Sequence, residues 1–470
     1  MKNFNDFIGL YTDHYEFTMA QGYFLDGREN STACHDYFFR KNPFNSGYTV
    51  FAGLYDLLEM ISNYNFNPES IDHLRKIGFN HEFLDYLIDF SFKGNIFAPQ
   101  EGEIVFSNEP IVRVEGSIIE TQLIETLLLN MLNFQSLIAT KASRLRLSAG
   151  EKSVMDFGLR RAQGLSAIHA SKAAVVGGVN STSNVYSAFA FGFESSGTQA
   201  HSWIQSYPDE LTAFRKYAKA FPKNCVLVVD TYSTLHSGIP NAITVAKEME
   251  KNGEMLWGIR LDSGDLAYLS KESRSMLDEA NLNYVKIVAS NQLNEYLIKS
   301  LLEQGAPIDA FGVGTSLLTG QHDAALDGVY KLNTIDESPS LKLSDNLEKV
   351  TLPGIKKIYR YYNGSGKFYA DAILLSEEEN IEKIIHPFHS HKSAEVGDCK
   401  KEELMTKVMD KGEIKIINYS VKEISEFVRE RLELLPDEHK RFENPHIYKV
   451  GISEKLFELR NKLMQRFYQS

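Results

Sequence analysis

The chain has 470 residues and a mass of 53.3 kDa, and 50 Lys and Arg against 62 Asp and Glu give a formal net charge of −12. Apolar residues make up 43% and aromatic residues 11%, which excludes wholesale disorder and a fibrous protein. The acidic balance argues against a general binder of nucleic acid or anionic membranes, but it leaves room for a local basic pocket. At about 150 residues per domain, the length predicts two to four domains.

Cysteine usage and the N-terminus indicate a cellular compartment. Cys34, Cys225 and Cys399 lie far apart and form no CxxC pair, so a reducing compartment is expected. The opening MKNFNDFIGL lacks the apolar core of a signal peptide, and no stretch of about 18 residues is apolar enough for a membrane span. The sequence therefore predicts a soluble, cytoplasmic protein that binds neither nucleic acid nor membrane.

Residues 1–150 are predicted to form an N-terminal α+β sheet domain. Apolar residues recur at helical spacing in several segments, and short alternating runs punctuated by Gly and Pro indicate an antiparallel sheet. Helices are expected over 17–24, 50–61, 81–90 and 118–148 (the last as one helix or two), and strands over 33–39, 103–106 and 111–115.

Residues 151–345 show a different rhythm, in which short apolar runs alternate with helical segments. Strands are expected at 153–157, 174–177, 194–198, 226–229, 257–260, 284–288 and 308–313, and helices at 240–251, 265–280 and 292–303. Such alternation predicts parallel strands with crossover helices, and both a doubly wound sheet and a barrel fit. Residues suited to chemistry follow each strand, which favours an α/β fold with an irregular (β/α) barrel of about seven strands, because all carboxyl ends then meet at one rim.

Residues 346–470 are predicted to be a C-terminal extension. A β-hairpin is expected around residues 363–366, and the tail from residue 420 is helical and charged.

The segment DFGLRRAQG (156–164) places Phe157 beside Arg160 and Arg161 at a strand end. Adjacent guanidiniums repel one another unless an anion lies close, and phosphate is a natural partner for them. The alternative is an ion pair with Asp156 at a helix start.

Two further loops carry small polar residues. GGVNSTSNV (177–185), which contains Ser183, leaves backbone N–H groups free to approach an anion, although it also fits an ordinary helix cap. GTQAHSW (197–203) places His201 near Thr198, and this histidine is either catalytic or structural.

GIRLDSGDL (258–266) combines Arg260 with Asp262 and Asp265. The arginine suits a planar ring or a phosphate, and the carboxylates suit ribose hydroxyls, Mg²⁺ or a developing cation. The alternative is an Asp helix cap with a nearby salt bridge. FGVGTSLLTG (311–320) has the composition of a phosphate-binding loop, and it follows the last strand, where barrels often bind phosphate.

These segments, taken in order, resemble the nicotinate phosphoribosyltransferase family. The resemblance runs from about residue 9 to about residue 360, and it is carried by LYTDHYEFTMAQGYF, DFGLRRAQG, GGVNSTSNV, GTQAHSW, VDTYSTLHSGIPNAI, GIRLDSGDLAYLSK, ASNQLNE, FGVGTSLLTG and VTLPGIKKIYR. It implies a type II phosphoribosyltransferase that works as a homodimer with shared active sites. The implied reaction, in NAD biosynthesis, joins nicotinate to phosphoribosyl pyrophosphate and is coupled to ATP hydrolysis with Mg²⁺.

The resemblance also implies roles for individual residues. His201 matches the histidine that ATP phosphorylates, Phe157 the aromatic residue that sandwiches the ring, and Tyr15 a tyrosine supplied by the partner subunit. His14, beside Tyr15, departs from the family, which often has an apolar residue there. We assign Asp262 to catalysis, as a carboxylate that holds ribose hydroxyls or stabilises the sugar cation. The predicted substrate-binding set is Tyr15, Phe157, Arg160, Arg161, Ser183, Thr198, Arg260, Ser263, Gly264, Asn291, Gly312, Gly314 and Thr315. The metal ligands are not assigned.

Three alternatives stay open. A related nicotinamide enzyme carries an aspartate where this chain has Ser183, and a carboxylate there would repel nicotinate. A quinolinate enzyme would need more cations for two carboxylates. A non-catalytic metabolite sensor would be expected to lack the histidine or the phosphate loop.

Overall fold

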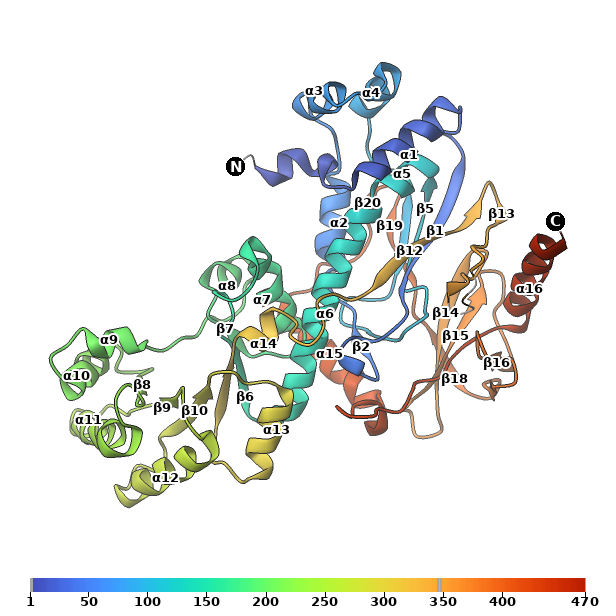
Figure 1. Cartoon of the computed structure of the whole chain (residues 1–470). Coiled ribbons are helices and arrows are strands. Elements are labelled where there is room, and N and C mark those ends of the chain that lie inside the picture. The colour runs from blue at the N-terminus through green and yellow to red at the C-terminus, as the bar shows by residue number, and fades with distance from the viewer. Residues whose placement is uncertain (1–2, 345, 347–348, 470) are drawn as a thin grey trace. The chain divides into compact units, whose positions relative to one another are not determined.

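The structure is a computed structural model, and it describes residues 3–344, 346 and 349–469 (Figure 1). The chain divides into two compact units. Unit 1 comprises Met1–Leu137, Ala325–Tyr419 and Glu426–Ser470, and unit 2 comprises Ile138–Ala324 and Ser420–Ser425. This division differs from the predicted limits of 1–150, 151–345 and 346–470, because the C-terminal residues group with the N-terminal ones.

Unit 1 is built on a seven-stranded antiparallel sheet of order β13-β12-β1-β5-β3-β19-β20. β1 pairs with both β12 and β5, and β19 pairs with β3, so strands from both ends of the chain share one sheet. The bounds are β1 Thr32–Phe39, β3 Asn95–Ala98, β5 Val112–Ser117, β12 Gly328–Ile335, β13 Ser338–Pro339, β19 Thr406–Asp410 and β20 Glu413–Ile414. The long-range pairing explains why the C-terminal region is not a separate extension.

Helices pack on this sheet and enclose the main hydrophobic core, which includes Phe17, Leu57 and Phe83. α5 packs against α1 and lies on β1 and β5. The helices are α1 His14–Leu25, α2 Leu54–Ser62, α3 Pro68–Lys76, α4 His81–Ile88, α5 Ile118–Leu123 and α6 Glu125–Ala149 (which ends in unit 2). The predicted helix at 118–148 is therefore two helices, and a capping box between Ser117 and Glu120 begins the first.

The C-terminal residues build a second sheet in unit 1, of order β17-β16-β21-β15-β14-β18. β14 and β15 form the antiparallel hairpin expected around residues 363–366. The remaining elements of unit 1 are β2 Thr49–Val50, β4 Ile104–Val105, β14 Lys356–Tyr362, β15 Phe368–Leu375, β16 Lys383–Ile385, β17 Ser393–Glu395, β18 Lys400–Glu403, β21 Val450–Ile452, α15 Val421–Leu434 (which begins in unit 2) and α16 Glu454–Gln469.

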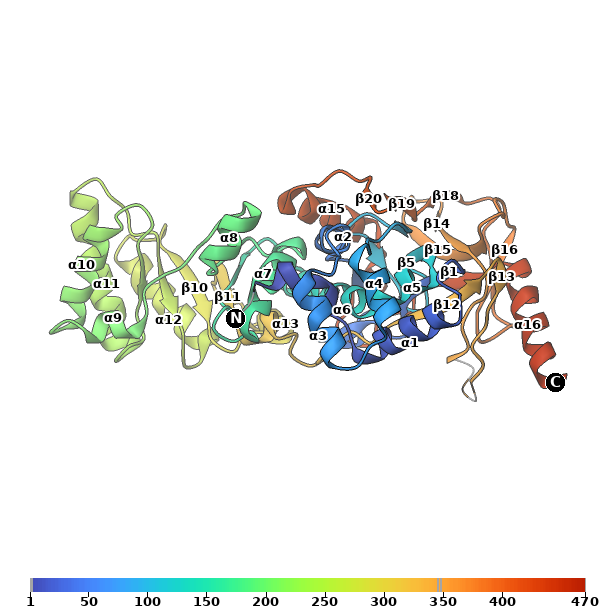
Figure 2. The ribbon, with the colours of Figure 1, turned by 90° about the horizontal axis from the view of Figure 1, so that it is seen from above.

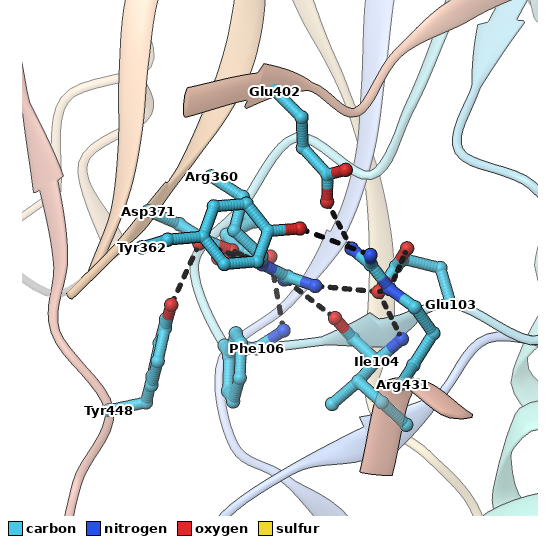
Figure 3. Close-up of polar contacts among 10 residues, drawn as sticks. Glu103, Ile104, Phe106, Arg360, Tyr362, Asp371, Glu402, Arg431 and Tyr448 are labelled. Atoms are coloured by element: carbon cyan, nitrogen blue, oxygen red, sulfur yellow. Dashed lines mark hydrogen bonds and ion pairs between the residues drawn. The ribbon is translucent and has the colours of Figure 1, made fainter. Parts of the chain in front are cut away.

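A buried ion network joins these elements of unit 1 (Figure 3). Arg360 on β14 donates to Glu103 Oε1 at 2.6 Å and to Asp371 Oδ2 on β15 at 2.6 Å. Arg431 on α15 donates to the same Glu103 oxygen at 2.9 Å and also to Glu402 on β18. Removing one partner would leave a buried charge unpaired, which is strongly destabilising, so the network favours this packing of the strands and the helix.

Unit 2 contains a six-stranded parallel sheet of order β7-β6-β11-β10-β9-β8. α10 packs against α11 and α11 against α12, and α12 also contacts β9 and β10. Figure 2 shows these helices beside β10. The strands are β6 Ser153–Asp156, β7 Ser181–Thr182, β8 Val226–Val228, β9 Gly258–Leu261, β10 Lys286–Ser290 and β11 Ala310–Val313. The helices are α7 Ala167–Val176, α8 Val185–Phe191, α9 His201–Gln205, α10 Glu210–Ala220, α11 Ile239–Lys251, α12 Leu266–Glu279, α13 Glu295–Glu303 and α14 Thr315–Leu318.

The alternating α/β pattern is confirmed, but two predicted strands are not. Residues 174–177 form the end of α7 and its C-cap instead of a strand. The alanine-rich run there is buried throughout, and apolar periodicity alone does not distinguish such a helix from a strand. The segment 194–198 makes a single isolated bridge, between Ser195 and Thr182. Six paired strands, not seven, are therefore formed in the described part of unit 2.

Six loops of unit 2 follow the carboxyl ends of its strands, whereas the segment 197–203, which carries Thr198 and His201, follows the isolated bridge at Ser195. The six loops are residues 157–166 after β6, 183–184 after β7, 229–233 after β8, 262–265 after β9, 291–294 after β10 and 314 after β11. The parallel sheet thus presents them along one edge, as the sequence predicts. No helix in the described residues is long and apolar enough to cross a membrane.

Candidate active site

His201 is the first residue of α9, and it meets residues from two other loops. Its Nδ1 lies 3.1 Å from Thr231 Oγ1, which follows β8. Its Nε2 lies 3.5 Å from Asp262 Oδ2, after β9, and 4.0 Å from Asp230 Oδ1. The side chain stays 38% exposed, so a substrate can reach the ring. The structure therefore brings the two predicted catalytic residues, His201 and Asp262, together.

The two carboxylates beside His201 are held in fixed orientations. Asp230 Oδ2 accepts hydrogen bonds from the Asp262 N–H at 2.8 Å and from Ser263 Oγ at 2.6 Å. Asp262 Oδ1 accepts from Ser290 Oγ. The sequence analysis assigns no individual role to Asp230 or Thr231, although both directly follow the predicted strand at 226–229, where residues suited to chemistry are expected.

Arg260 lies on β9 and faces the same cluster. Its Nη1 donates to Thr198 Oγ1 at 2.6 Å, and its Nη2 lies 3.7 Å from Asp262 Oδ2. The side chain is only 13% exposed, and its Nε is buried without a hydrogen-bond partner. A buried guanidinium with a spare donor is well suited to an anionic ligand.

Asp156 organises the loops after β6 and β7. It is buried, and it accepts from the Gly158 N–H at 2.7 Å, from Ser171 Oγ at 2.9 Å and from Thr182 Oγ1 at 2.6 Å. Burial raises the pKa of Asp156, and these three hydrogen bonds oppose the rise. The Asp156 carbonyl also accepts from the Ser183 N–H at 2.7 Å, so the hydroxyl of Ser183, and not its N–H, is the donor left for a ligand.

Phe157 packs directly over a glycine of the last strand. A Cβ on Gly312 would lie 2.4 Å from Cε2 of the Phe157 ring, so any larger residue there must displace the ring. The Phe157 N–H donates to the Val313 carbonyl at 2.8 Å, which fixes the backbone under the ring.

The predicted phosphate loop follows β11 and enters the short helix α14. Here Gly314 approaches the neighbouring loop closely, since a Cβ on Gly158 would meet the Gly314 carbonyl at 2.8 Å. Ser316 Oγ is buried without a partner, and Thr315 is exposed. Asn291, at the end of β10, has a positive φ of 79°.

Arg160 and Arg161 are exposed and form no ion pair with any described residue. The Asp156 carboxylate is occupied by hydroxyl and backbone donors, so the alternative of an ion pair between Asp156 and these arginines is wrong.

Tyr15 lies in unit 1, at the second residue of α1, and is 47% exposed. Burial of part of its ring and a hydrogen bond to Glu16 raise the pKa of its hydroxyl. The neighbouring His14, which departs from the family pattern, packs its ring 5.6 Å from that of Phe79.

Unit 1 also contains a cationic cavity of about 650 Å³. Its charged and imidazole lining residues are Arg40, Lys41, His386 and His446, and none of its described lining residues is acidic. In a chain of net charge −12, such a cavity favours an anionic ligand.

Three family models match the chain. The model of the nicotinate phosphoribosyltransferase N-terminal domain matches residues 10–133, that of the nicotinate phosphoribosyltransferase family residues 152–393, and that of the C-terminal domain residues 355–460. A nicotinate phosphoribosyltransferase from Bacillus subtilis is 44% identical over 99% of this chain and 96% of its own length. This chain belongs to the nicotinate phosphoribosyltransferase family.

Further proteins resemble this chain in sequence, in fold or in both. The nicotinate phosphoribosyltransferase from Dictyostelium discoideum is 37% identical over 98% of this chain and 89% of its own. The crystal structure of human nicotinic acid phosphoribosyltransferase superposes with a TM-score of 0.86 at 30% identity, covering 96% of this chain and 99% of that one. A nicotinate-nucleotide pyrophosphorylase from Pyrococcus furiosus shares the fold, with a TM-score of 0.73 at 23% identity over 92% of this chain and 97% of that one.

Proposed function

We propose that this chain transfers the phosphoribosyl group of phosphoribosyl pyrophosphate to nicotinate, which yields nicotinate mononucleotide and pyrophosphate for NAD biosynthesis. The observation that carries the proposal is the cluster of His201, Asp262, Arg260 and Thr198 at the strand ends of unit 2, joined by contacts of 2.6–3.7 Å. Full-length relatives in bacteria and eukaryotes carry the name of this activity.

Phosphoribosyl transfer requires that the site stabilise developing charges and position both substrates. Cleavage at the anomeric carbon develops a sugar cation and a leaving pyrophosphate, and the ring nitrogen of nicotinate, unprotonated near pH 7, needs no strong base. Asp262, held by Ser290, supplies a carboxylate for the ribose hydroxyls or the cation, and Arg260 supplies positive charge for the anionic substrate. Phe157 supplies a flat surface for the pyridine ring.

The loop after β11 is proposed to hold a phosphate group. Gly312 and Gly314 allow close backbone approach, and the unpaired Ser316 hydroxyl is a buried donor beside Thr315. Arg160 and Arg161, exposed and without ion pairs, supply further charge, and Ser263, Gly264 and Asn291 line the neighbouring strand ends.

ATP is proposed to drive the reaction by phosphorylating His201. The half-exposed ring has a nitrogen lone pair and fixed carboxylates beside it, which suits an attacking nucleophile. A phosphohistidine would add roughly two negative charges next to the substrate phosphates.

Mg²⁺ is proposed to accompany the phosphates of the substrates. No group of three His, Cys, Asp or Glu in the described residues is arranged to hold a metal by itself. Mg²⁺ is commonly bound by one or two carboxylates plus substrate phosphates, and the unpaired Asp230 Oδ1 and the Asp262 carboxylate fit that use. When bound, the ion would neutralise charge on the leaving pyrophosphate.

A homodimer with shared active sites is proposed from an exposed apolar surface on unit 2. Val185, Tyr186 and Phe189 on α8 are 70%, 61% and 86% exposed, and Leu165 is 73% exposed. α8 begins directly after the loop that carries Ser183, so a second copy covering it would border the site. The exposed Tyr15 is proposed to act in the site of the partner copy.

The cationic cavity of unit 1 is consistent with polyphosphate substrates, since ATP and phosphoribosyl pyrophosphate are both polyanions.

We also propose that the segment at 194–198, which already bridges Thr182 through Ser195, completes an irregular seven-stranded barrel.

Nicotinamide is the rival substrate, and Ser183 favours nicotinate over it. The hydroxyl of Ser183 tolerates a carboxylate, whereas an aspartate in this loop would repel one. The test supplies the purified chain with phosphoribosyl pyrophosphate and nicotinate, nicotinamide or quinolinate in turn, and measures each mononucleotide and pyrophosphate. Nicotinate should be preferred, and Ser183→Asp should lower kcat/KM for nicotinate more than Ser183→Ala does. A preference for nicotinamide in the wild-type chain would overturn the proposal.

A further inference from the structure

Gln199 is the one buried residue between residues 192 and 200, and its side chain lacks partners. The residue is 5% exposed, and neither Oε1 nor Nε2 forms a hydrogen bond although both atoms are shielded from solvent. Burying an amide without partners costs free energy, so native structures rarely keep such a group without a reason. Something other than the amide itself must hold this loop in place.

The residues on either side of Gln199 form the contacts that hold this loop in place. Thr198 Oγ1 accepts from Arg260 at 2.6 Å, and His201 Nδ1 contacts Thr231 Oγ1 at 3.1 Å. Between them, the backbone N–H groups of residues 197–200 donate no hydrogen bond to any described residue. On the N-terminal side the Ser196 N–H donates to the Thr182 carbonyl at 2.8 Å. Residues 197–200 are therefore fixed between that bond and two side-chain contacts, made by residues that the substrate itself is expected to engage.

We propose that Gln199 is a substrate-binding residue, whose amide, unpaired in this arrangement of the loop, binds a phosphoryl oxygen of the substrate in a second arrangement. The proposal rests on the proposed function. When a phosphate-bearing substrate competes for Arg260, the contact to Thr198 weakens and the loop is released. The amide then gains a partner, so substrate binding and loop position are coupled. As a neutral donor, an amide pairs with the phosphoryl oxygen without adding charge to the site.

The test compares Gln199→Met with wild type, and uses Gln205→Met as the matched control. Methionine has nearly the same volume without polar atoms, and Gln205 is an exposed glutamine on α9, four residues after His201. In the ligand-free protein, Gln199→Met should raise Tm by about 2–4 °C, because the unpaired amide is removed. Its kcat/KM for phosphoribosyl pyrophosphate should fall about tenfold or more, while KM for nicotinate changes little. Gln205→Met should match wild type in both measurements.

A second measurement needs no turnover. Inorganic pyrophosphate should raise Tm of the wild-type protein more than it raises Tm of Gln199→Met. A Gln199→Met protein with a lower Tm would show that the amide is satisfied in the folded chain, and would overturn the proposal. A raised Tm with wild-type kinetics and a wild-type pyrophosphate shift would overturn it too. If the wild-type chain forms no nicotinate mononucleotide, the proposed function fails, and the pyrophosphate shift still decides the role of Gln199.

Discussion

Arg260 Nη1 donates a hydrogen bond of 2.6 Å to Thr198 Oγ1, which joins strand β9 to the loop that leads into His201. The same guanidinium lies 3.7 Å from Asp262, so one side chain connects the histidine loop with the carboxylate loop. This connection places three predicted site residues in one arrangement, and several predictions depend on it.

Replacing Arg260 with lysine should lower kcat/KM about 100-fold, because lysine keeps the charge but does not bridge Thr198 and Asp262 with one planar group. Arg215→Lys is the control, since Arg215 pairs with Glu248 on the surface of unit 2. Steady-state rates for both variants decide the matter. Wild-type kinetics in Arg260→Lys would show that the bridge does not contribute to turnover.

Phe157→Ala should raise KM for nicotinate well above its effect on KM for phosphoribosyl pyrophosphate, because ring stacking contributes about 1–3 kcal/mol. Gly312→Ala should produce the same selective defect, since the new Cβ displaces the Phe157 ring. Gly364→Ala, at a glycine with open space around it, is the control. Equal changes in both KM values would count against Phe157 as a ring contact.

Shared active sites predict complementation between two inactive variants. Mixing Tyr15→Ala with Arg260→Ala subunits should restore part of the activity, because a hybrid dimer holds one site in which both residues are intact. Subunit exchange is checked with distinct affinity tags. Hybrids that form and remain inactive would contradict the assignment of Tyr15 to the site of the partner.

Glu125 predicts a pH dependence of stability. Burial, followed by the negative charge of Glu16, raises the pKa of Glu125 to about 7, whereas an unfolded glutamate titrates near ~4.3. Between these pH values the unfolded chain loses the proton that the folded chain keeps. The contribution of protonated Glu125 to the free energy of unfolding is therefore complete below pH ~4.3 and is lost as the pH rises through 7.

Glu125→Gln should therefore flatten the fall in the free energy of unfolding between pH 5 and pH 8. The gain at pH 8 should be on the order of 2 kcal/mol, with allowance for partial exposure. Urea unfolding at both pH values measures it, with the exposed Glu59→Gln as control. Parallel pH profiles of the free energy of unfolding for wild type and Glu125→Gln would refute the raised pKa of Glu125.

Local sequence predicts the elements of unit 2 well where apolar runs are short and bounded. The strand at 226–229 and the helix at 240–251 appear as β8 and α11 with limits shifted by one residue. The run at 174–177 is misassigned because α7 is buried and alanine-rich. The seven-stranded sheet of unit 1 depends on pairing between residues about 300 apart in sequence, such as β1 with β12, which local patterns do not encode.

The candidate site is also predicted only in part from the sequence. Sequence places His201 in one segment and Arg260 with Asp262 in another. The parallel sheet explains the position of the second segment at the end of β9, but His201 lies on a segment that follows only an isolated bridge. Sequence does not predict which side chains orient these residues. Ser290 holds Asp262 and Thr231 contacts His201, and these partners depend on strand order and on rotamers rather than on motif spacing.

His201 is proposed to couple ATP hydrolysis to phosphoribosyl transfer onto nicotinate. One reaction measures this coupling: nicotinate mononucleotide and ADP are quantified together, for wild type and for a folded His201→Ala protein, with and without ATP. Wild type should release ADP and form more product with ATP. His201→Ala should release no ADP and form a small, ATP-independent amount of product, because Arg260, Phe157 and the phosphate loop still position both substrates. ADP release by the folded His201→Ala protein, or product formation by wild type that is indifferent to ATP, would contradict the account.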